Sequence, residues 1–158
     1  MAVIRDLGSH FPIYRSSTLA RETDFWKIIT YPVAIIAATA GTGDVVGAFV
    51  APHRMIVTGV TLMDVDGGVT ANATDYATVV VTNKGAAAGE TTVVASRATD
   101  TVTTDDVTQY VPWTVTLSTT QADLIIERGE AVMVSITKTN SGVAVGQSIV
   151  SINTKAIE

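Results

Sequence analysis

Hydrophobic and polar residues alternate with a period of two in most segments after residue 26, and clusters rich in Gly, Asn and Asp separate these segments. Such alternation is typical of half-buried β-strands. The segments expected to be strands are 26–38, 45–50, 55–64, 76–82, 91–97, 109–117, 123–127, 131–138 and 147–155. The pattern predicts an all-β domain of about eight antiparallel strands, a sandwich or barrel, with no room for a helix of normal length.

Three of these segments also predict which side chains share a face. In 131–138 the shared face holds Val132, Val134 and Ile136. In 147–155 one face holds Ser148, Val150 and Ile152, and the other holds Ile149, Ser151 and Asn153. Strict alternation in 55–64 places Ile56, Thr58, Val60 and Leu62 on one face and Val57, Gly59, Thr61 and Met63 on the other.

Residues 1–25 lack this alternation, yet residues 1–31 hold five of the nine aromatic residues. A solvated disordered tail is normally poor in such side chains. We therefore expect an extended N-terminal arm at 1–25 and a β-sandwich domain at 26–158. The arm could pack on its own domain or dock on a neighbouring subunit or a larger surface. The expected contact residues are Arg5, Phe11, Tyr14, Arg15, Phe25 and Trp26.

Charge and composition narrow the possible partners. Charged residues make up 16% of the chain and the net charge is −5. Residues 1–31 carry four cations against three acids, a net +1, so the remainder carries −6. An acidic body is unsuited to nucleic acid, where cationic contacts to phosphate dominate affinity. No apolar run is long enough to span a membrane, and the N-terminus lacks a signal-peptide pattern.

Candidate catalytic residues are few. The chain has no cysteine, which excludes disulfides, thiolate metal ligands and thiol nucleophiles. Its two histidines are His10, in the expected arm, and His53, which follows Pro52 in a turn and is expected to be exposed. Neither lies in a recognisable motif of nucleophilic catalysis. The sequence therefore predicts no enzyme and no catalytic residue.

Acidic and glycine-rich turns give equally little support for a cofactor or metal. Asp64 and Asp66 lie in DVDGG, which resembles the start of a calcium loop, but the later oxygen ligands are missing. Asp105 and Asp106 are expected to be solvated loop charges. The turn 41–43 lacks the Lys-Ser/Thr pair of a phosphate-binding loop. We expect no cofactor and no metal.

Trp113 and Tyr110 are the aromatic residues that could bind a sugar. Within a continuous strand 109–117 they are three positions apart and lie on opposite faces, so they cannot form one stacking platform. Trp113 is expected to be a core residue.

Three stretches together resemble a known family. They are the apolar, aromatic arm 1–26, the segment VAPHRMIVTGVTLMDVDGG and the segment LIIERGEAVMVSITKTNSGVAVGQSIVSI. The chain resembles the decoration, or cement, proteins of tailed-bacteriophage heads and related head and tail adhesin modules with a jelly-roll fold.

This resemblance implies a jelly-roll virion protein that binds the major capsid protein on the capsid exterior. It implies a homo-oligomer, with a trimer favoured, made in the host cytoplasm. The acidic charge and the lack of a long apolar run add the expectation of no nucleic-acid and no membrane partner. One alternative is a carbohydrate- or receptor-binding module of a phage tail or of a secreted glycan-degrading system. A second is a jelly-roll hydrolase, which needs facing acids or a histidine site.

Overall fold

A computed structural model describes residues 28–33, 43–141 and 145–157 of the 158-residue chain. The expected arm at 1–25 lies outside the described residues, as do residues 34–38 of the first expected strand and most of the turn at 41–43. The arm residues that this leaves as predictions are Arg5, His10, Phe11, Tyr14, Arg15, Phe25 and Trp26.

The described residues form nine strands and one short 3-10 helix, so the expected absence of a normal-length helix holds for this part of the chain. The strands are β1 Ile28–Val33, β2 Gly43–Val50, β3 Met55–Asp64, β4 Ala77–Asn83, β5 Thr92–Ala98, β6 Trp113–Leu117, β7 Ile125–Ile126, β8 Ala131–Lys138 and β9 Ser148–Ala156. The helix, η2, covers Gln121–Leu124.

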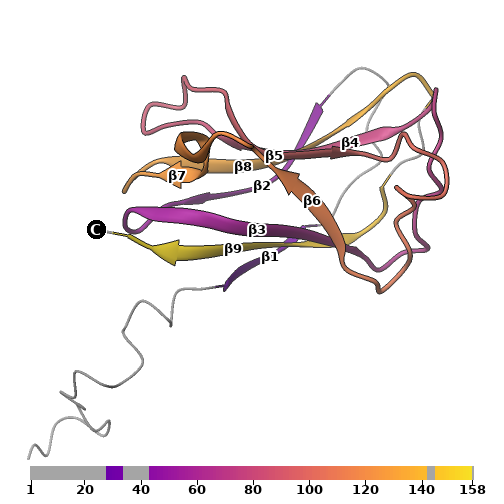
Figure 1. Cartoon of the computed structure of the whole chain (residues 1–158), viewed down its shortest axis with the longest axis horizontal. Coiled ribbons are helices and arrows are strands. Elements are labelled where there is room, and N and C mark those ends of the chain that lie inside the picture. Colours follow the sequence, from indigo (N-terminus) through magenta and orange to yellow (C-terminus); the bar gives the residue numbers. More distant parts are fainter. Residues whose placement is uncertain (1–27, 34–42, 142–144, 158) are drawn as a thin grey trace, which may run out of the picture.

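The strands lie in two facing layers (Figure 1). One layer has the order β1-β9-β3-β6 and the other β2-β8-β4-β5, and every pairing is antiparallel. This is the strand order of a jelly-roll, in which most successive strands lie in opposite sheets, and here, among the described strands, only β4 and β5 pair as a hairpin within one sheet. β6 pairs with β3 through its first half and with β5 through its second, so it joins the two layers along one side. The expected all-β sandwich of the jelly-roll type is confirmed.

The hydrophobic core fills the space between the two layers. Inward positions of β8 and β9 alternate as expected, with Val132, Val134 and Ile136 buried on one strand and Val150 and Ile152 on the other. Side chains of β3, β4, β5 and β6 complete the same cluster. Burial of these large aliphatic side chains on both sheets supplies most of the driving force for the fold.

The faces predicted for β3 are wrong in its first half. Met55 and Val57 are buried together with Val60 and Leu62, whereas Thr58 is exposed. The register with β9 shifts between Val57 and Gly59, which identifies a β-bulge. The extra residue reverses the phase of the alternation, so residues on both sides of the bulge point into the core.

The expected strand 109–117 begins later than predicted. β6 starts at Trp113, directly after Pro112, and Tyr110 has a φ of +62° in a turn. Proline lacks a backbone N–H and cannot donate to a sheet ladder, which favours a strand start immediately after it. Trp113 is 6% exposed and belongs to the core, as expected.

Candidate binding surface

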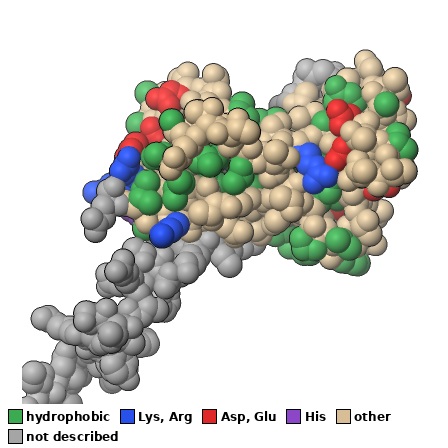
Figure 2. All heavy atoms as spheres, viewed as in Figure 1, with side chains coloured by type: hydrophobic (Ala, Val, Ile, Leu, Met, Phe, Trp, Pro, Cys, Tyr) green, Lys and Arg blue, Asp and Glu red, His purple; other side chains and the backbone are tan. Residues whose placement is uncertain are grey.

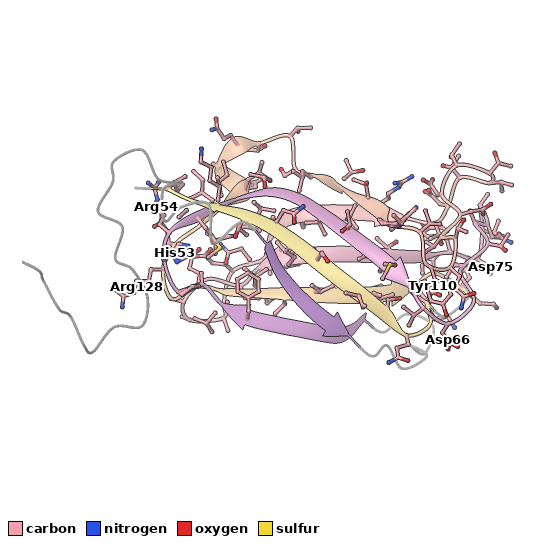
Figure 3. The ribbon with its side chains drawn as sticks, turned by 90° about the horizontal axis from the view of Figure 1, so that it is seen from below. His53, Arg54, Asp66, Asp75, Tyr110 and Arg128 are labelled. Carbon is pink, nitrogen blue, oxygen red and sulfur yellow. The ribbon has the colours of Figure 1, made fainter. Side chains whose placement is uncertain are left out.

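Two long loops cover one end of the sandwich, which we call the loop end. They are residues 65–76, between β3 and β4, and residues 99–112, between β5 and β6. Val69 and Val107 join them through reciprocal backbone hydrogen bonds, in which each N–H donates to the other residue's oxygen at 2.8 and 2.9 Å. Asp66, Asp75 and Tyr110 all lie at this end (Figure 3).

Asp64 holds the turn at the start of the loop 65–76 through its buried side chain. Its side chain is fully buried at the end of β3. Its Oδ1 accepts hydrogen bonds from the backbone N–H groups of Asp66 and Gly68, both at 2.8 Å. Its Oδ2 lies 3.4 Å from the hydroxyl of Ser148. The carboxylate therefore shapes the DVDGG turn through backbone hydrogen bonds, as expected for a turn and not for a calcium loop.

Tyr110 is fixed in place by the same residue. Its N–H donates to the backbone oxygen of Asp64 at 2.8 Å, and the side chain of neighbouring Gln109 donates to the Val65 oxygen at 3.0 Å. These bonds hold Tyr110 in the left-handed region that non-glycine residues rarely occupy. The residue is 64% exposed. The loop end thus presents an aromatic side chain on a rigid backbone.

Arg97 attaches the loop 99–112 to the sheet. Its guanidinium lies 4.5 Å from the centre of the Trp113 ring, within range of a cation–π interaction. It also donates to the Asp105 carboxylate, at 2.6 Å through Nη2 and 3.0 Å through Nε, and to the backbone oxygens of Thr104 and Thr114. Arg97 thereby connects loop and strand by several charge-assisted hydrogen bonds.

The hydrogen bonds from Arg97 lower the pKa of Asp105, so the prediction that Asp105 is a free solvated charge is wrong. Asp106 is similarly engaged, since its Oδ1 accepts the N–H of Ala71 at 2.7 Å. Sequence reasoning missed both contacts because neither follows from a periodic pattern: Arg97 lies on a strand eight residues before Asp105, and Ala71 lies on another loop.

This contact predicts a pH-dependent cost for Asp105→Asn. The carboxylate has a lower pKa in the folded protein than its ordinary value, so its stabilisation is present above about pH 4 and is lost as the pH falls through the folded pKa. We expect the variant to lose about 1–3 kcal/mol at pH 7, and the difference from wild type to shrink below about pH 4. Urea unfolding across this pH range measures it. Asp100→Asn, at an exposed acid in the same loop that makes no bond to Arg97, is the control and should cost less than Asp105→Asn at pH 7.

A third loop is joined to this surface. The side-chain amide of Asn140 donates to the Thr74 oxygen at 2.8 Å, and the Ser141 N–H donates to the Asp75 carboxylate at 3.0 Å. Within the loop 65–76, the Asn72 side chain accepts the N–H groups of Thr74 and Asp75. These local contacts restrict the loops, so the loop end is a fixed surface.

The opposite end of the sandwich carries His53, Arg54 and Arg128 (Figure 3). His53 is half-buried in its turn, so the expectation that it is exposed is wrong. Arg54 pairs with Glu127 at 2.8 Å. Among the residues that the structure describes, no three His, Asp or Glu side chains gather closely enough to hold a metal ion.

An open groove of about 450 Å³ runs along the outer side of β5 and β6. Its lining is mostly hydroxyl-bearing and includes one carboxylate, and it consists of Thr92, Val93, Ser96, Thr116, Leu117, Ser118, Thr119 and Asp123. This lining holds no aromatic ring on which a sugar could stack. With Trp113 buried and Tyr110 outside the strand, the two aromatics considered above form no shared platform.

The fold and its loop end define an all-β jelly-roll domain with a rigid terminal surface. No protein-family model matches the chain, and no curated protein matches it. Among solved structures, it is similar to a chain in the structure of infectious bursal disease virus, Gx strain, with 12% sequence identity and a TM-score of 0.38. The match covers 80% of this chain and 32% of that one, so this chain spans about a third of the solved chain's length.

In the part of the chain that the structure describes, no helix has the length and apolar character needed to cross a membrane.

On the face shown in Figure 2, charged side chains are sparse and uncharged surface dominates. This agrees with the low charged content of the sequence.

Proposed function

We propose that the protein is a structural virion component that decorates and stabilises a bacteriophage capsid. It binds the outer capsid surface as an oligomer, with a trimer favoured, and its partner is the major capsid protein. The observation that carries this proposal is a jelly-roll body preceded by a segment, residues 1–31, that holds five of the nine aromatic and four of the ten cationic residues. Such a segment supplies the anchor side chains that dominate protein interfaces.

Avidity explains how a small protein of this type could hold a capsid. Each arm offers a few anchors, such as Phe11, Tyr14 and Trp26, and would bind weakly alone. An oligomer presents several arms at once, so binding of the first arm raises the effective concentration of the others. The jelly-roll body provides the fixed frame from which these arms extend.

The proposal assigns no catalytic role to the polar side chains of the body. Asp64 and Asn72 accept backbone N–H groups of their own loops, and Arg97 joins a loop to a strand. The polar side chains of these residues hold the loops in place through hydrogen bonds. A surface that must remain unchanged under load in a particle benefits from such rigidity.

Deletion of residues 1–25 tests the proposal. We expect the truncated chain to keep its β-sheet circular dichroism and a cooperative thermal transition, but to lose cosedimentation with capsids of the virus that carries the gene. Full-length Glu90→Ala, altered at an exposed position between β4 and β5 and away from the loop end, serves as the control and should cosediment as wild type does. Saturating decoration by the truncated chain would contradict the proposed role of the arm.

A further inference from the structure

The loop end exposes apolar side chains that do not contribute to the core. Tyr110 is 64% exposed, Val111 is 51% exposed, and Val102 in the same loop is 56% exposed. Tyr110 holds a positive φ, which costs free energy unless surrounding bonds impose it. A strained backbone that presents a rigid aromatic side chain to solvent is characteristic of binding sites.

The two loops that form this end are acidic. The loops 65–76 and 99–112 contain five aspartates and no lysine or arginine. One of the five, Asp105, is neutralised by Arg97. The surface therefore combines an aromatic anchor with uncompensated negative charge, so a matching partner segment would carry aromatic or aliphatic anchors together with arginine.

The chain itself contains a segment of this chemistry. Residues 7–21, LGSHFPIYRSSTLAR, hold Phe11, Ile13 and Tyr14 with two arginines, Arg15 and Arg21, and no acid. Arginine and aromatic side chains are the types that most often dominate binding energy at interfaces. The complement of the loop end is thus present in the arm.

The direction of β1 favours a neighbouring copy as the source of that segment. Val33 pairs with Ser148, which pairs with Asp64 at the loop end, whereas Ile28 pairs with Asn153 further along β9. The chain before Ile28 is therefore attached on the side of β1 away from the loop end. Tyr14 lies 14 residues before Ile28, so an extended chain can carry it up to about 50 Å from β1, which is far enough to reach a second body.

We propose that the loop end of one copy binds residues 7–21 of a neighbouring copy, with Tyr110 and Val111 as the anchors of the acceptor surface. This inference rests on the proposed role of the arm as a binding segment. It adds that the arm joins subunits to one another, through a head-to-tail contact that closes into a ring when the rotation between copies permits.

The test uses two full-length variants that each lack one half of the contact. The acceptor variant is Tyr110→Gly, because glycine adopts this backbone conformation without strain and should leave the melting temperature unchanged or higher. The donor variant carries Phe11→Ser, Tyr14→Ser and Arg15→Ser. Sedimentation velocity should show wild-type oligomers and at least about tenfold weaker self-association of each variant.

Mixing the two variants supplies the decisive result. The acceptor variant still has an intact arm and the donor variant still has an intact loop end, so an equimolar mixture should form a one-way heterodimer. Wild-type-like oligomers of Tyr110→Gly, monomeric wild type, or a mixture that stays monomeric would each overturn the inference. If Tyr110→Gly misfolds, Tyr110→Asn replaces it, since asparagine tolerates the left-handed region.

Capsid binding is measured on the same samples, so that the two proposals can fail separately. If both variants lose self-association while the wild type still binds capsids, the contact between subunits is supported. If both variants bind capsids and form the same oligomer as wild type, this inference is wrong. The proposed function is then unaffected. If the wild-type oligomer does not bind capsids, the proposed function is contradicted. The inferred contact between copies is then unaffected.

Discussion

Gly68→Ala is expected to lower the free energy of unfolding by about 2–5 kcal/mol. A Cβ at this position would lie 2.5 Å from the backbone oxygen of Val107, and the φ of Gly68 is +79°. The Val107 oxygen cannot move freely, because it accepts the N–H of Val69 in the bridge between the two loops. The loops must therefore separate, or the bridge must break, to admit a methyl group.

Gly129→Ala is the matched control for this prediction. Its φ of +88° is close to that of Gly68, but a Cβ there would have no atom within 4 Å. Only the left-handed strain remains, which costs about 1–2 kcal/mol. Urea unfolding of both variants separates the cost of backbone strain from the cost of the steric clash with Val107. Equal losses would mean that the contact with Val107 contributes nothing.

Local sequence patterns were sufficient to predict most strands. β8 was predicted with its observed bounds, 131–138, and its three apolar inward residues are buried. Gly129 and Glu130, and the aspartates and glycines at 64–68, are typical of turns, and the structure has turns at these places beside β8 and β3. These predictions worked because the alternation of buried residues and the preferences of turn residues are local in sequence. They do not depend on which strand is the pairing partner.

The bulge in β3 depends on a distant partner, so strict alternation missed it. Its position follows from the pairing of Val57 with Thr154 and of Gly59 with Asn153 on β9. One signal in the sequence could have found it, since a glycine inside a strand often accompanies a bulge or a close approach. A Cβ on Gly59 would lie 3.2 Å from the Asn153 side chain.

The loop end was the least predictable part for the same reason. Sequence patterns placed Tyr110 in a strand, because nothing local shows that its N–H bonds to Asp64. The ion pair between Arg97 and Asp105 joins a strand to a loop and gives no periodic signal. Whether the predicted arm residues make the contacts assigned to them stays a prediction, since residues 1–27 lie outside the described chain.

Asp64→Ala is expected to cost about 3–5 kcal/mol, because it removes a buried acceptor shared by two backbone N–H groups. The N–H groups of Asp66 and Gly68 both point to Oδ1 at 2.8 Å, and the substitution leaves them without this charged acceptor. The loss should also weaken the anchoring of Tyr110, whose N–H bonds to the Asp64 oxygen. Thermal and urea unfolding measure the effect.

Asp66→Ala removes the same charge from the same turn, two residues away, at an exposed position. A substitution at such a position normally changes stability by no more than about 0.5 kcal/mol, so the two alanine variants should differ several-fold in cost. Similar losses, accompanied by a rise in melting temperature of the wild type on adding calcium, would mean that the two carboxylates act together on a cation. A large loss confined to Asp64 means that the turn is held by hydrogen bonds to its own backbone.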